Sequence, residues 1–122
     1  MSNTQKVMEF IAAWEARDIE KILALMTPDA FYHNIPMQPA TGRDAIRAML
    51  SAFLANATDV KWTVHHIAET PAGVVLTERT DVFHMGPKTL SLPVMGTFEF
   101  KDGLISKWRD YFDLGQFQAQ IA

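Results

Sequence analysis

The most informative stretch of this sequence is Thr77-Glu78-Arg79-Thr80-Asp81, in the middle of an alternating segment that runs from Gly73 to Met85. The alternation predicts a strand, which we expect to be the longest in the chain. Because side chains of a strand point to alternate faces, Arg79 and Asp81 share a face with apolar neighbours such as Phe83. Charged groups on an apolar face are unfavourable unless they are paired, and Asp is rare inside strands. We therefore expect a pocket built around this charged pair.

The composition indicates a small globular protein. Its 122 residues suffice for one domain that buries roughly two-thirds of the surface of the unfolded chain. The net charge of −3 and the isoelectric point near 5.7 argue against nucleic acid as a partner. The absence of cysteine excludes disulfides and a thiolate nucleophile. No leader-like or membrane-spanning stretch is visible, so we expect a soluble, cytoplasmic protein that does not bind membranes.

Helical patterns precede strand patterns along most of the chain. Capping-box signals at Ser2 and Thr41, and helix-start signals at Asp18 and Asp113, predict helices over about 2–17, 18–26, 41–56 and 113–121. Period-two alternation predicts strands over 31–35, 60–69, 73–85, 89–101 and 104–112. This order predicts an α+β fold, a curved and largely antiparallel sheet whose concave side is covered by helices.

Two of the eight aspartates have no local structural explanation. Six lie at expected helix starts or in turns, where Asp commonly bonds the backbone: Asp18, Asp29, Asp44, Asp59, Asp102 and Asp113. The other two are Asp81 and Asp110, and Asp110 shares a strand face with Trp108 and Phe112. If the strands bring both carboxyls together, Arg79 can bridge them and the pair would retain one proton. One carboxyl could then act as an acid and the other as a base.

The same pattern also fits a purely structural ion-pair network, and the residues of the pair favour neither interpretation. Tyr32 and Asn34 tip the balance slightly towards catalysis, because they lie on one face of a short strand and could hold a water against the base. A metal site is not indicated, since His65 and His66 point to opposite faces of a strand. No serine lies in a nucleophile elbow, which argues against a serine hydrolase.

Four segments resemble limonene-1,2-epoxide hydrolases of the nuclear-transport-factor-2-like (SnoaL-like) superfamily. They are Tyr32-His33-Asn34-Ile35-Pro36, Thr41-Gly42-Arg43-Asp44-Ala45, Thr77-Glu78-Arg79-Thr80-Asp81-Val82 and Trp108-Arg109-Asp110-Tyr111-Phe112-Asp113-Leu114. The resemblance runs in order from about Phe31 to Phe117. It implies a cone-shaped α+β fold, usually a homodimer, and an enzyme that converts an epoxide and water to a vicinal diol in one step. It implies neither a cofactor nor a covalent enzyme intermediate.

The resemblance also implies roles for five residues. Asp110 corresponds to the general base, and Tyr32 and Asn34 help it to hold the nucleophilic water. Asp81 corresponds to the general acid that protonates the epoxide oxygen, and Arg79 bridges the two carboxyls. We expect a hydrophobic substrate, such as a cyclic terpene or cycloalkene oxide, between apolar walls. The inward residues that would form these walls are Phe53, Phe83, Leu92, Val94, Phe112 and Phe117.

The chain departs from the limonene enzyme at Pro93 and Met95, so its substrate range need not match. We also expect it to begin later than that enzyme, with an effect on pocket closure. Two alternatives keep the fold and change the function. One is a SnoaL-like polyketide cyclase or a ketosteroid-isomerase-like enzyme that uses one Asp as a proton shuttle. The other is a non-catalytic, dimeric small-molecule-binding module whose polar network only stabilises the fold.

Overall fold

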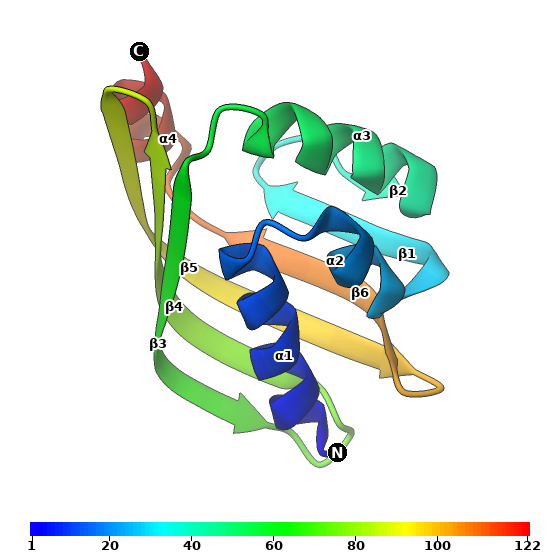
Figure 1. The fold of residues 1–122 in the computed structure, drawn as a ribbon. Coiled ribbons are helices and arrows are strands. Elements are labelled where there is room, and N and C mark those ends of the chain that lie inside the picture. The colour runs from blue at the N-terminus through cyan, green and yellow to red at the C-terminus, as the bar shows by residue number, and fades with distance from the viewer.

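The computed structural model describes residues 1–122 and contains one curved six-stranded sheet with helices packed on one face (Figure 1). The strand order is β2-β1-β6-β5-β4-β3. The helices are α1 (Asn3–Glu15), α2 (Ile19–Ala24), α3 (Arg43–Leu54) and α4 (Leu114–Ile121). The strands are β1 (Met26–Ile35), β2 (Ala40–Thr41), β3 (Asp59–Glu69), β4 (Val75–Met85), β5 (Lys88–Lys101) and β6 (Leu104–Tyr111). The predicted α+β class is confirmed.

Three of the predicted helix starts are confirmed by their caps. Ser2 and Gln5 form the capping box of α1, and the Asp18 side chain accepts from the backbone of Lys21 at the start of α2. The Asp113 side chain accepts from the backbone of Gln116 at the start of α4. Helix α2 ends earlier than predicted, because Met26 already belongs to β1 and pairs with Ile105 of β6. Residues 27–29, which were predicted to end that helix, therefore lie inside β1.

The predicted capping box at Thr41 is wrong. Thr41 belongs to β2, where it pairs with Phe31, and Gly42 is the residue that precedes α3. Gly42 has a φ of 89°, a conformation that glycine adopts without steric cost, and no side chain caps this helix. The chain thus turns from the edge strand β2 into α3 through the backbone conformation of Gly42, without a side-chain cap.

The predictions for the four strands after α3 are close to the structure, but three corrections are needed. β1 begins at Met26 and not at residue 31, β2 was not predicted, and β4 is not the longest strand. β5 is the longest strand with 14 residues, whereas β4 has 11. Neighbouring strands pair antiparallel except β1 and β6, which are parallel. The parallel pair sets Tyr32 beside Trp108 and Asn34 beside Asp110. Residues from distant parts of the sequence therefore share the concave face of the sheet.

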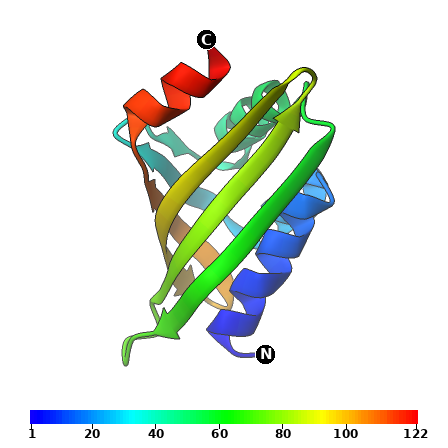
Figure 2. The same ribbon diagram turned by 90° about the vertical axis from the view of Figure 1, so that its left-hand side faces the viewer.

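Helix α1 lies across the sheet and carries much of the core (Figure 1). Five of its residues are buried: Val7, Phe10, Ile11, Ala13 and Trp14. The rings of Phe10 and Trp14 pack edge-on against Trp108, with centroids 4.9 and 5.6 Å away. Helix α4 lies at the end of the sheet away from the N-terminus, beside the turn that joins β4 and β5 (Figure 2). It contains no buried residue. None of the helices is long and apolar enough to cross a membrane.

Candidate active site

A cavity of about 340 Å³ opens between the sheet and the helices. Four of the five predicted catalytic residues line it, namely Tyr32, Asn34, Asp81 and Asp110. All six predicted wall residues line it as well: Phe53, Phe83, Leu92, Val94, Phe112 and Phe117. Six further lining residues were not predicted: Trp14, Met37, Gln38, Met49, Leu50 and Trp62. The carboxyls thus face a largely apolar space.

Arg79 lies behind the two carboxyls, and its side chain has no exposed surface. Its Nε and Nη2 donate to Asp81 at 3.0 and 2.8 Å. Its Nη1 and Nη2 donate to Asp110 at 3.2 and 2.8 Å, and Nη1 also donates to the Thr77 hydroxyl at 3.0 Å. A guanidinium has five N–H groups, so every one of them has a protein partner. The arginine is held rigidly by the two carboxyls that it bridges, and Trp62 covers its face at 4.6 Å.

A glycine permits the bridge between Arg79 and Asp110. These residues belong to β4 and β6, which are separated by β5. Gly96 of β5 lies between them, paired with Thr77 on one side and Asp110 on the other. A Cβ at this position would come closer than 3.0 Å to both Arg79 Nη1 and Asp110 Oδ1. The guanidinium can therefore cross over β5 only because residue 96 has no side chain.

The two carboxyls have unequal surroundings. Asp110 Oδ1 accepts from the Trp108 indole N–H at 2.8 Å in addition to its bonds from Arg79. Asp81 accepts bonds from Arg79 alone. Asp110 is therefore held by one more hydrogen-bond donor than Asp81.

Tyr32 and Asn34 lie beside Asp110 on the neighbouring strand. The phenol of Tyr32 stacks on Trp108 with centroids 3.9 Å apart, and its hydroxyl donates to Asn34 Oδ1 at 3.0 Å. This bond fixes the orientation of the amide, whose oxygen keeps a second lone pair. The two side chains present oxygen acceptors next to a carboxylate, an arrangement that can bind one water.

The electrostatic environment favours the protonated form of Asp81 and keeps the phenol of Tyr32 neutral. Burial raises the pKa of Asp81 to about 6, against the opposing effect of its hydrogen bonds from Arg79. Burial, and then the charge of Asp110, raise the pKa of Tyr32 well above its ordinary value. Burial would lower the pKa of Arg79, but the charges and bonds of Asp110 and Asp81 outweigh burial and raise it. At neutral pH the guanidinium remains charged and the phenol remains protonated.

Three residues that hold the site together were missed by the sequence prediction: Thr77, Gly96 and Trp108. Gly96 did leave a signal, because it interrupts a series of bulky residues on the inward face of β5, from Leu90 to Phe98. Trp108 gave a weaker one, since it lies two residues before Asp110 and shares its face. The other candidates lie away from the cavity. His33, His65, His66, His84, Glu78 and Glu99 are exposed or half-buried, and none lines it.

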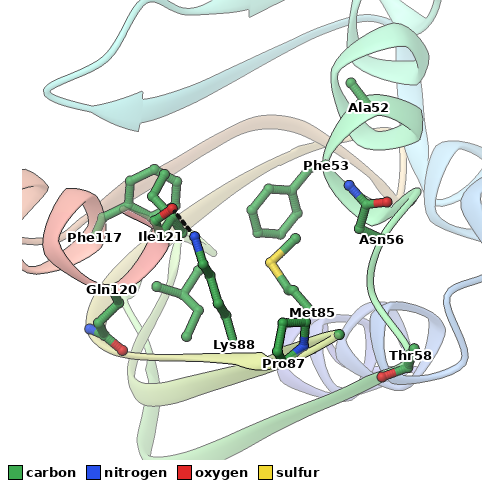
Figure 3. Close-up of a pocket in the computed structure, with 12 residues that line it drawn as sticks. Ala52, Phe53, Asn56, Thr58, Met85, Pro87, Lys88, Phe117, Gln120 and Ile121 are labelled. Atoms are coloured by element: carbon green, nitrogen blue, oxygen red, sulfur yellow. Dashed lines mark hydrogen bonds between the residues drawn. The ribbon is translucent and has the colours of Figure 1, made fainter.

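A second, larger cavity of about 480 Å³ lies next to the first, between α3, α4 and the turn from β4 to β5 (Figure 3). It contains none of the aspartates of the first cavity, but Phe53 and Phe117 line both. The predicted catalytic carboxyls therefore belong to the smaller cavity, and two phenyl rings line both spaces.

Comparison with known proteins gives matches along the whole chain. The family model for the limonene-1,2-epoxide hydrolase catalytic domain matches residues 1–122. The epoxide hydrolase EphG of Mycobacterium tuberculosis is 32% identical over 108 residues, which span 88% of this chain and 71% of EphG. The match includes more than two-thirds of both proteins.

Solved structures agree with this match. A limonene-epoxide-hydrolase-like epoxide hydrolase of M. tuberculosis superposes with a TM-score of 0.83 at 30% identity, over 97% of this chain and 87% of that one. A putative SnoaL-like polyketide cyclase of Shewanella denitrificans has a TM-score of 0.87 over 98% of this chain and 96% of that one. Its identity is 14%, so it shares the fold alone. The predicted nuclear-transport-factor-2-like fold is confirmed.

Proposed function

The chain belongs to the limonene-1,2-epoxide hydrolase family, and from this membership we propose that it adds water to a hydrophobic epoxide to give a vicinal diol. The observation that supports this best is the bridge from Arg79 to two unequal carboxyls at the wall of an apolar cavity. Hydrolysis of an epoxide needs an acid, a base and a positioned water, and this group of side chains can supply all three.

Asp81 is the general acid in this proposal. Its raised pKa lets it keep a proton close to neutral pH, where it can protonate the epoxide oxygen as the ring opens. Arg79 holds the carboxyl in place and stabilises the carboxylate that remains after proton transfer.

Asp110 is the general base. Bonds from Arg79 and Trp108 hold its carboxyl in place, and Asn34 is its direct neighbour on β1. The nucleophilic water donates one hydrogen to Asp110 and the other to an oxygen of the Tyr32–Asn34 pair. Its remaining lone pairs then face the cavity, where the substrate carbon lies.

The step balances without a cofactor or an enzyme ester. The water oxygen forms a bond to one epoxide carbon while the bond from that carbon to the epoxide oxygen breaks. The epoxide oxygen takes the proton of Asp81, and Asp110 takes a proton from the water. A proton must then return from Asp110 to Asp81, directly or through solvent, before the next turnover. The apolar walls favour a cyclic terpene oxide or a cycloalkene oxide over a polar epoxide.

A single-turnover experiment in ¹⁸O-labelled water tests this proposal. With enzyme in excess over limonene oxide or cyclohexene oxide, we expect a diol that carries one ¹⁸O atom at full enrichment. Unlabelled diol would mean that an enzyme oxygen attacks first, which contradicts the role of Asp110 as a base. Absence of diol from both substrates would contradict hydrolysis and favour a cyclase, an isomerase or a binding module. The expected homodimer stays a prediction, which light scattering at micromolar concentration tests.

A further inference from the structure

The larger cavity adjoins the candidate active site through two phenyl rings. Phe53 projects from α3 and Phe117 from α4, and both rings line both cavities (Figure 3). Both side chains are half-buried and pack against the edge of the core, where the ring of Phe53 lies edge-on to Phe83 with centroids 4.9 Å apart. A ligand in the smaller cavity that extends past these rings enters the larger one.

The larger cavity has an apolar lining with few free polar groups. Half of its twelve lining residues are hydrophobic: Ala52, Phe53, Met85, Leu90, Phe117 and Ile121. Lys88 Nζ is bonded to the carbonyls of Ile121 and Ala122, each at 2.8 Å. The Gln120 amide exchanges two bonds with the backbone of Ser91, and the Thr58 hydroxyl donates to the His84 carbonyl. Because the polar side chains largely serve the protein itself, the space offers little to an anion or a sugar.

The helix that covers this cavity is weakly anchored. Helix α4 has no buried residue. Its hydrogen bonds to the sheet are the one from Lys88 of β5 to the Ile121 carbonyl and the two between Gln120 and Ser91 of β5. Its Phe117 lies edge-on to Phe112, with centroids 6.0 Å apart. A cover of this kind can shift to admit a chain without breaking core packing.

From this geometry we propose that the larger cavity is a subsite for the tail of the substrate, and that the enzyme accepts elongated epoxides with a slender, unbranched apolar chain. The epoxide lies at Asp81 and Asp110, and the chain passes Phe53 and Phe117 into the larger cavity. This inference rests on the proposed function, because it places the epoxide at the two carboxyls. A slender chain fits better than a second ring, since it must pass between two aromatic side chains.

Chain length and cavity filling provide the test. For the wild-type protein we expect kcat/KM to be higher for 1,2-epoxydecane than for 1,2-epoxyhexane, below the concentration at which either aggregates. Met85→Trp and Ala52→Trp each fill part of the larger cavity, and neither residue lines the smaller one. We expect each variant to lower the ratio of the two kcat/KM values by about tenfold or more.

The matched control is Ala48→Trp. Ala48 is exposed on α3, one turn before Ala52, and lines neither cavity. Helical side chains lean towards the N-terminus, so this indole points away from the larger cavity. We expect the ratio to stay within twofold of wild type. An unchanged ratio in both Met85→Trp and Ala52→Trp, with both epoxides still hydrolysed, overturns the subsite and leaves the proposed function standing.

A binding measurement keeps the two proposals separable if no epoxide is hydrolysed. Calorimetric titration with 1,2-decanediol and 1,2-hexanediol reports affinity without any turnover. Each buried methylene contributes roughly a two- to fourfold gain in affinity, so the longer diol should bind at least about tenfold more tightly to wild type. Loss of this advantage in Met85→Trp supports the subsite even without hydrolysis. The subsite is overturned if wild type does not bind the longer diol more tightly, or if Met85→Trp keeps the same preference for it.

Discussion

The floor of the smaller cavity is formed by Asp81 and Asp110, with Arg79 behind them, and every donor of the Arg79 guanidinium has a protein partner. At the mouth of the cavity, formed by Met37, Gln38, Phe53 and Phe117, all the side chains are exposed or half-buried. The charged groups of the floor lie at hydrogen-bonding distance on β4 and β6, the two strands that flank β5. The mouth consists of flexible or aromatic side chains on helices and a loop. The difference teaches that exact side-chain positions matter at the floor, where the proposed proton transfers take place. In the same proposal the mouth needs only to exclude water and admit a substrate.

The substitution with the largest expected effect is Asp110→Asn at the floor. The amide has nearly the same size but cannot accept the proton of the water, so we expect kcat to fall by about 10²–10⁴-fold. Circular dichroism should show a retained fold. The control is Glu78→Gln, which removes a carboxylate on the outer face of β4. An Asp110→Asn variant that folds and retains wild-type turnover would contradict the assignment of the base.

The next test breaks the geometry of the floor without removing a charge. Gly96→Ala places a methyl group closer than 3.0 Å to Arg79 and Asp110, so the bridge must move. We expect kcat/KM to fall by at least tenfold and the free energy of unfolding to fall by about 1–3 kcal/mol. Thr97→Ala, at the next position of β5, is the control and should change both quantities little. Wild-type activity in Gly96→Ala would mean that close approach at β5 does not matter.

The pH dependence should come from Asp81 at the floor, because the four residues of the mouth have no ionisable side chain. Asp81 must be protonated to act as an acid, so we expect kcat/KM to fall about tenfold per pH unit above pH 6. The raised pKa also means that the folded protein binds this proton more tightly than the unfolded chain does. Its contribution to stability is complete below pH 4 and is lost as the pH rises through about 6. Urea denaturation between pH 4 and 8 should show this loss in wild type and a flatter profile in Asp81→Asn. Equal slopes would contradict the raised pKa.

The smallest expected effect is a substitution at the mouth. Phe117→Leu keeps an apolar side chain on a helix without buried residues, so we expect a change of less than fivefold in kcat/KM for cyclohexene oxide. The same exchange at Phe10, which is fully buried on α1, should cost about 1–3 kcal/mol of stability. Thermal denaturation of both variants makes the comparison. A larger loss of stability at Phe117 than at Phe10 would show that α4 is anchored more firmly than its contacts indicate.

Strand periodicity was enough to predict the inward direction of Asp81, Asp110 and Arg79, because alternation along a strand is a local property. It also bears on four of the six wall residues, whereas Phe53 and Phe117 belong to helices that were predicted from helical patterns. It did not predict that β5 separates the two aspartates or that β1 runs parallel to β6, since strand order depends on contacts between distant segments. The errors at Thr41 and Met26 have the same cause. Both residues pair with a neighbouring strand, and this pairing outweighs the local helix signal.

The glycine at position 96 has a consequence for interpreting other sequences of this fold. A residue without a side chain, on the inward face of a central strand, marks a place where a side chain from one neighbouring strand can reach the other. Arg-x-Asp on one strand and Trp-x-Asp on a non-adjacent strand can then act as one unit only if the strand between them leaves this gap. A search for candidate sites could therefore require all three strands together. Such a criterion would distinguish chains in which both aspartates can share one arginine from chains that carry the same motifs without a crossing point.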